Sequence, residues 1–430
     1  MEMLFEHMIF IIDVPLSGIP RMKTISMAYF YGGKGKHMKY RHLNLKYSLI
    51  NAFYFMLMCG SAGFANNFLQ AKGLETSVIG MILTGVSILA LFGQTGMAPI
   101  IDRSEKLNEK KFIIFTLLVS IAMVVLLCFI PSGSMLVIPI TILGFAFASM
   151  GVPYLNSIAF IYESEGQTIN YGLGRGVGSA AYAVAGLLIG QLISRTSAEI
   201  LPYWIVGNSV LALLVVSTLQ VPQKVEKKET EEAQPKGSYI EFFKKYSDIV
   251  MVIVALICLY FCHMLINSYM INILENIGGT AADQGNATFI QALVELPPMF
   301  LFALILKKFK VDHIMAFAAV FYSIKHIMIL MTGNLVMYYA AMVMQMVSYA
   351  LIVPATVYFA DSHIAPEDRN QGQVLMGATG TIGGLLSASI GGILIQAVGV
   401  HTTLVIATGV SVIGTLLMLW SVFRLSGKKK

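Results

Sequence analysis

Charge is scarce in this sequence. Asp, Glu, Lys and Arg make up 12% of its 430 residues, whereas hydrophobic residues make up 57% and the mean hydropathy is +0.74. A water-soluble domain needs about 25% charged residues to cover its surface. Most of the surface must therefore face lipid, and twelve helices of about 20 residues each would fit within the chain.

Motifs for ATP use and catalysis are also missing. No phosphate-binding Gly-Lys-Ser/Thr loop occurs, which excludes an ATP-driven pump. No Ser/His/Asp, metal-ligand or paired-carboxylate pattern indicates an enzyme, and no cofactor or metal is expected. The net charge of +6 does not indicate nucleic-acid binding, because the basic residues form short clusters between apolar runs. All four cysteines fall in apolar stretches without zinc or redox spacing and are interpreted as small apolar side chains: Cys59, Cys128, Cys258 and Cys262.

The apolar runs predict an all-α integral membrane protein. Gly and Pro separate the runs, as at Pro131–Gly133 and Gly278-Gly279. The twelve expected transmembrane helices lie near residues 47–70, 76–101, 112–130, 135–162, 171–194, 201–221, 247–274, 285–306, 311–331, 335–361, 370–396 and 401–423.

One long polar insert divides these helices into six and six. It is rich in Lys and Glu and cannot bury a core, so it predicts a flexible cytoplasmic linker. The expected parts are an N-terminal extension, a six-helix bundle, the linker, a second six-helix bundle and a cytoplasmic tail: residues 1–45, 46–221, 222–246, 247–424 and 425–430.

The first 37 residues fit poorly with the rest. The apolar run Met8–Leu16 is too short to span a membrane, and no basic region or cleavage site marks it as a signal peptide. The Gly- and Lys-rich run before Met38 could encode a purine-rich ribosome-binding site. We therefore expect translation to start at Met38; the alternative is a disordered cytoplasmic tail.

Basic residues are distributed unequally between the two sides of the predicted helices. Only Lys72 and Arg195 fall on one side. Cytoplasmic loops carry the excess of Lys and Arg, so both termini are expected in the cytoplasm and the chain in a bacterial cytoplasmic membrane. The predicted cytoplasmic set is Arg41, Lys46, Arg103, Lys106, Lys110, Lys111, the linker lysines, Lys307, Lys308, Lys310, Arg369 and Lys428–Lys430.

The two halves repeat each other. Val152-Pro153 in the fourth helix matches Val353-Pro354 in the tenth, about 200 residues later, and both the fifth and eleventh helices are rich in Gly. The repeat resembles the major facilitator fold, in which two pseudo-symmetric six-helix bundles hold a solute site between them. It implies alternating access and a chain that works as a monomer.

Ionisable residues inside the predicted helices are few. A charge at mid-helix costs about 2.5–3.5 kcal/mol on insertion scales, so such residues tend to mark a transport pathway. Glu295 is interpreted as a carboxylate that takes up a proton, with His263 as a second candidate. Lys325 lies in the ninth helix, and Asn267 shares a polar stripe with His263. The alternatives are a structural Glu295–Lys325 pair and a His263 that is only an interior hydrogen-bonding residue.

The loop after the second helix carries a partial signature. Asp102-Arg103 and Lys110-Lys111 resemble the major facilitator motif between helices two and three, although Pro99 stands where that motif has Gly. The resemblance implies a charge cluster that latches one conformation. The alternative is a solvated charged loop.

The fifth helix resembles the oligosaccharide–proton symporter group, which includes lactose permease. The run YGLGRGVGSAAYAVAGLLIG, with ALVELPPMF in the eighth helix, carries the likeness. In that group an arginine after a Tyr/Phe-Gly pair contacts sugar hydroxyls, and this role transfers to Arg175, with Tyr182 as a ring beneath the sugar. Arg175 could instead only snorkel to the interface.

Some parts of the chain depart from that group. Where lactose permease has a glutamate in helix four, this chain has Asn156. Asn156 is kept as a candidate solute contact, together with His263, Asn267 and Lys325. The tenth helix offers Gln345 and Tyr349, which are not proton carriers.

The predicted function is proton-coupled symport of a neutral polar solute, a sugar or a nucleoside. The partners are then the solute, a proton and the lipid bilayer. One alternative is proton-coupled efflux of amphipathic compounds, and another is a non-transporting membrane sensor. The sequence leaves open the direction of transport and the choice between proton and sodium.

Overall fold

The computed structural model describes residues 42–104, 107–164, 169–220, 239–366 and 368–428. The N-terminal extension up to residue 41 and most of the expected linker, residues 221–238, lie outside the described residues. Leu43–Lys430 form one compact unit.

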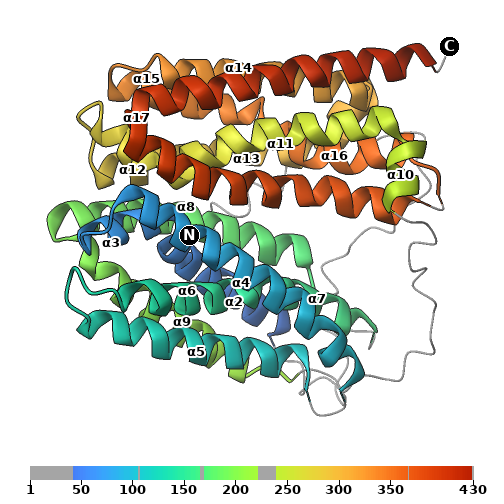
Figure 1. The fold of residues 1–430 in the computed structure, drawn as a ribbon. Coiled ribbons are helices and arrows are strands. Elements are labelled where there is room, and N and C mark those ends of the chain that lie inside the picture. The colour runs from blue at the N-terminus through green and yellow to red at the C-terminus, as the bar shows by residue number, and fades with distance from the viewer. Residues whose placement is uncertain (1–41, 105–106, 165–168, 221–238, 367, 429–430) are drawn as a thin grey trace, which may run out of the picture. The chain divides into compact units, whose positions relative to one another are not determined.

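Helices are the only regular elements in the described residues (Figure 1). The N-terminal half contains α2 (Leu43–Met58), the π-helix η3 (Cys59–Gly63), α3 (Ala65–Ala71), α4 (Thr76–Arg103), α5 (Glu109–Phe129), α6 (Val137–Met150), α7 (Val152–Ser164), α8 (Tyr171–Arg195), the short η4 (Ala198–Ile200) and α9 (Leu201–Ser217). The C-terminal half contains α10 (Tyr239–Lys245), α11 (Ser247–Ser268), α12 (Met270–Glu275), α13 (Ala281–Lys308), α14 (Val311–Leu330), α15 (Leu335–Val343), the short η5 (Met344–Met346), α16 (Tyr349–His363) and α17 (Arg369–Lys428).

Twelve segments of the described chain are long and apolar enough to cross a membrane, which agrees with the number expected from the sequence. Ten helices are long and apolar enough, and the bent pair Leu43–Gly63 and Ala65–Ala71 adds another. The longest helix, α17, is in fact two helices joined at Gly399. Gly399 has φ +80° and ψ 169°, a backbone region that is essentially confined to glycine and would cost another residue about 1–3 kcal/mol. The all-α membrane fold is therefore confirmed.

Four of the twelve segments consist of two helices, a feature that the apolar runs in the sequence do not show. The first bends by 49° at Phe64, and the fourth is interrupted at Gly151. The seventh breaks at Tyr269 and the tenth over Val347-Ser348. Hydropathy could not reveal these breaks, because Phe64, Tyr269 and Val347 are themselves apolar. The breaks recur in every third segment, as expected if each half contains two three-helix repeats.

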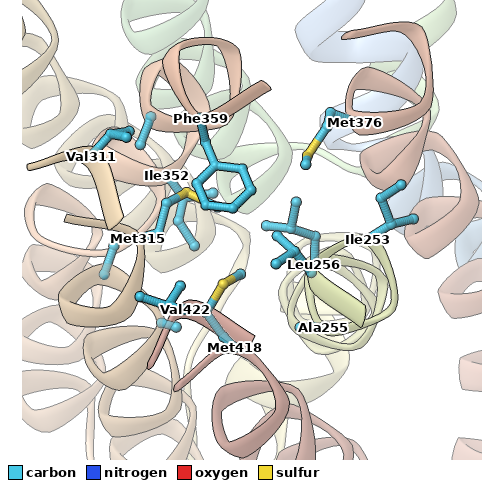
Figure 2. Close-up of a cluster of buried hydrophobic side chains, with 14 of the residues drawn as sticks. Ile253, Ala255, Leu256, Val311, Met315, Ile352, Phe359, Met376, Met418 and Val422 are labelled. Atoms are coloured by element: carbon cyan, nitrogen blue, oxygen red, sulfur yellow. The ribbon is translucent and has the colours of Figure 1, made fainter. Parts of the chain in front are cut away.

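A hydrophobic core holds the C-terminal half together. Side chains from α11, α14, α16 and both parts of α17 converge in it (Figure 2). Phe359 and Met315 are completely buried at its centre. The other side chains labelled in the figure are Ile253, Ala255, Leu256, Val311, Ile352, Met376, Met418 and Val422.

The two halves meet through small residues. α8 packs on α13, and α4 packs on α17. At the first crossing, a Cβ added to Gly190 would lie 2.5 Å from the carbonyl oxygen of Ala281, and one added to Gly285 would lie 2.5 Å from that of Gly186. Glycines at helical spacing thus allow the two backbones to touch, as small residues do between membrane helices.

An ion pair attaches α10 to the rest of the C-terminal half. This helix lies within the segment expected to be a linker. Lys245 Nζ donates to Asp368 at 2.7 Å, and Tyr246 donates to the same carboxylate oxygen at 2.9 Å. Phe242 is buried in the core beneath. Hydrogen bonds from Lys245 and then Tyr246 lower the pKa of Asp368, so this attachment is present at neutral pH and is lost as pH falls through the lowered pKa.

Replacing Asp368 with Asn is expected to loosen α10. Because exposed ion pairs are weak, tryptic cleavage after Lys244 and Lys245 should accelerate by up to about fivefold. Limited proteolysis followed by mass spectrometry measures this rate. Asp361→Asn is the matched control, since Asp361 pairs with Arg369 at 2.9 Å instead. Equal cleavage of both variants would show that Asp368 does not hold α10.

Candidate solute cavity

A cavity of about 440 Å³ lies between the two halves. The N-terminal half contributes Phe55, Ala62 and Gly63 from α2 and η3, and Ser179 and Tyr182 from α8. The breaks in the first, seventh and tenth segments all border it, which is where irregular backbone is tolerated at membrane depth. The C-terminal half contributes Met264, Asn267, Ser268, Met270, Gln284, Thr288, Gln291, Ala292, Glu295, Leu296, Met299 and Tyr349.

Glu295 is the one ionisable carboxylate in this lining, and it is connected to Lys325 through Gln345. Gln345 Nε2 donates to Glu295 Oε1 at 2.8 Å, while Lys325 Nζ donates to Gln345 Oε1. Lys325 and Gln345 are both completely buried. The amide thus separates the two charges while linking α13 to α14, and the lysine balances the carboxylate without reaching the cavity.

His263 lies one layer behind the cavity wall. Its ring stacks on Tyr349 at 4.9 Å and meets the edge of Tyr322 at 5.6 Å. Its Nε2 is 3.1 Å from the amide nitrogen of Asn267, which does line the cavity. His263 is 2% exposed, so in this conformation it supports Tyr349 and Asn267 rather than facing a solute.

Arg175 also lies behind the wall. Its guanidinium stacks over the ring of Phe55 at 4.4 Å, and Phe55 faces the cavity. Its Nη1 is buried and has no hydrogen-bond partner among the described residues. Tyr182 lines the cavity itself, together with Asn267 and Glu295. The other three predicted residues lie behind the lining: Arg175, His263 and Lys325.

Three further predicted residues, Asn156, Lys110 and Lys111, do not line the cavity. Asn156 is on α7, and its buried Oδ1 has no hydrogen-bond partner within the part of the chain that the structure describes. The side chains of Asp102 and Arg103 lie outside the described part of the chain. Lys110 donates to the carbonyl oxygens of Ser217 and Leu219 at 2.8 and 2.5 Å, and so caps the end of α9 in its own half. Lys111 lies in the first turn of α5, where its backbone N–H donates to Asn108.

Several lining residues escaped the sequence analysis. Gln284, Gln291 and Thr288 are uncharged, so their cost in a membrane is low and hydropathy does not mark them. They do share one face of α13 with Glu295, at spacings of three to four residues, and that stripe was the available signal. Among the described residues, no group of His, Cys, Asp and Glu could hold a metal ion.

Twelve apolar segments surround a cavity between two halves. The chain belongs to the MFS_1 like family of the major facilitator superfamily, which it matches over residues 43–406. It is therefore a multi-pass membrane transporter for a small-molecule solute, and not an enzyme. No curated protein matches it in sequence.

Solved structures share the fold at low identity. The nucleoside transporter NupG aligns with a TM-score of 0.75 and 13% identity, covering 88% of this chain and 98% of its own. A NupG mutant gives 0.74 and 14%, covering 88% and 99%. A bacterial homologue of the human lysosomal transporter Spinster, in an inward-facing and occupied conformation, gives 0.66 and 16%, covering 90% and 97%. At these identities the likeness concerns the fold alone.

Proposed function

We propose that this protein is a secondary transporter that takes up a neutral, hydroxyl-bearing solute together with a proton. The observation that carries the proposal is the cavity between the halves, whose lining holds a single carboxylate, Glu295, balanced through Gln345 by a buried lysine. Rocking of the halves around this cavity would expose it to each side in turn.

The walls suit a solute with both a flat apolar side and several hydroxyl groups. Phe55, Tyr182 and Tyr349 provide aromatic surface, while Gln284 and Gln291 provide amides that donate and accept. The volume is within the range of small-molecule sites. A nucleoside combines these two features in one molecule, and NupG, which shares the fold, is a nucleoside transporter. We therefore place nucleosides first and oligosaccharides second.

Uptake into energised membrane vesicles tests the function. Labelled uridine, adenosine, lactose and sucrose would be supplied with and without a protonophore, and with and without sodium. We expect a nucleoside to accumulate and a protonophore to abolish the accumulation. Uptake that ignores the protonophore and requires sodium would overturn proton coupling, and accumulation of the sugars alone would overturn the preference for nucleosides.

Efflux of amphipathic compounds is the second candidate. Met264, Met270, Met299 and Leu296 give the cavity an adaptable apolar side. This candidate predicts that cells expressing the protein retain less ethidium than cells expressing the Glu295→Gln variant. Equal retention would favour uptake of a polar solute.

We also propose that both termini lie in the cytoplasm of a bacterial cell, because the basic loops gather on that side. The loops around Lys72, Arg195 and Gly278 would then face outward. Fusion of reporter enzymes to these loops tests the orientation.

Arg175→Lys is expected to raise the apparent KM for the solute about tenfold with little change in maximal rate. An ammonium cannot reproduce a planar guanidinium that stacks on Phe55 and so holds the ring that faces the cavity. Initial rates of uptake against concentration provide the measurement. Arg195→Lys, at the opposite end of α8, is the matched control. An unchanged KM would mean that Arg175 only anchors the helix.

A further inference from the structure

Two neighbouring asparagines on α3 join the N-terminal half to the C-terminal half. Asn66 Nδ2 donates to the carbonyl oxygen of Ser268 at 3.0 Å and to Asn272 Oδ1 at 2.7 Å. Asn67 Nδ2 donates to Gln284 Oε1 at 2.9 Å. Asn66 and Asn67 are 2% and 5% exposed, so these bonds form away from solvent.

Gln284, in the C-terminal half, also donates a hydrogen bond back to the N-terminal half. Its Nε2 donates to the carbonyl oxygen of Gly63 at 2.9 Å, at the point where the first segment breaks. Gln284 therefore accepts from one residue of the N-terminal half and donates to another. It also lines the cavity, as do Gly63 and Ser268. We call Asn66, Asn67, Asn272 and Gln284 the amide clasp.

We propose that the amide clasp holds the cavity shut at the α3 end, and that Gln284 is the residue through which cavity contents act on that closure. Each hydrogen bond between the two halves stabilises the closed arrangement modestly, and several together favour it over separation. A solute hydroxyl that takes over a bond to the Gln284 amide would weaken the clasp directly, with no intervening relay. The assignment rests on the proposed function for the identity of the cavity, but its test requires no solute.

The distance between two spin labels across this end measures the closure. Met135 and Val336 are 77% and 78% exposed and belong to opposite halves. The loop before Met135 is bonded to Lys72 through Gly133, and Leu335, next to Val336, lies against Gly279. Both labels therefore report on the α3 end. They would be placed as cysteines after replacement of Cys59, Cys128, Cys258 and Cys262 by alanine.

Gln284→Ala should raise the ratio of open to closed populations about tenfold without any added solute, because two cross-half hydrogen bonds are lost. Asn67→Ala should have a smaller effect, since the bond from Gln284 to Gly63 survives. The double variant should match Gln284→Ala alone. Asn286→Ala is the control, because Asn286 lies on the same helix but donates to Tyr339 in its own half.

Access to the cavity gives a second readout. A cysteine at Ser179, which lines the cavity on α8, should react about tenfold faster with a membrane-impermeant thiol reagent from the α3 side when Gln284 is alanine. Unchanged distances and unchanged labelling, or an equal effect of Asn286→Ala, would overturn the clasp. If Gln284→Ala does not fold, Asn67→Ala carries the same test from the other half. A shift in populations without uptake of any solute would refute the proposed function and leave the clasp intact.

Discussion

Glu295→Gln is expected to abolish gradient-driven accumulation while leaving solute exchange intact. A membrane potential of 100 mV supplies about 2.3 kcal/mol per charge, which supports roughly fiftyfold accumulation, and the variant should fall to none. Glutamine keeps the size of the side chain and an Oε1 that can accept from Gln345, so the contact at 2.8 Å survives. The ability to gain and lose a proton disappears, and the negative charge that balances Lys325 disappears with it.

Two assays in the same vesicles separate coupling from binding. Accumulation of labelled uridine against a proton gradient should be lost, whereas exchange of external label with preloaded uridine should continue. Glu275→Gln is the matched control, because Glu275 ends α12 outside the cavity lining. Persistent protonophore-sensitive accumulation in Glu295→Gln would remove Glu295 as the proton site.

The fold could be predicted from the sequence because a bilayer imposes strong constraints. Apolar runs of the right length mark each crossing, and the single polar insert marks the division into halves. What could not be predicted were the breaks at Phe64, Tyr269 and Val347. An apolar residue that leaves helical geometry has the same hydropathy as one that keeps it, because hydropathy describes side chains and not backbone hydrogen bonds. At the first and seventh breaks, distant side-chain amides donate to the carbonyl oxygens of Gly63 and Ser268.

The site residues that could be predicted from the sequence are those whose side chains cost the most free energy to place in a membrane. Glu295 and Lys325 stand out because a charge at mid-helix is expensive. Their connection through Gln345 could not be foreseen, because nothing in the sequence shows which partner a buried amide in a distant helix will meet. The same holds for Gln284 and Asn67, whose partnership spans the two halves. The resemblance to sugar symporters identified Tyr182 as a candidate that does line the cavity, but gave no indication that Arg175 would lie behind Phe55.

Lys325→Met is expected to destabilise the protein, and a second change, Glu295→Gln, is expected to restore most of the loss. Lys325 is completely buried, and its ammonium balances Glu295 across Gln345. Removing one partner of a buried charge pair costs about 3–5 kcal/mol, because the remaining charge stays in a medium of low dielectric constant. Removing both leaves no charge to compensate. Thermal unfolding of the purified protein measures the two single variants and the double variant.

The double-mutant cycle decides whether the two charges act as a unit. We expect a coupling of at least about 2 kcal/mol, and simple additivity would mean that Gln345 insulates the charges instead of linking them. Lys308→Met, at the exposed end of α13, controls for loss of a lysine.

If the two charges are coupled, protonation of Glu295 also changes the packing of α13 against α14. When Glu295 is neutral, the lysine is the unbalanced charge, so the contact that Gln345 makes between α13 and α14 becomes less favourable. The double variant should therefore be stable and still exchange solute, but be unable to accumulate it.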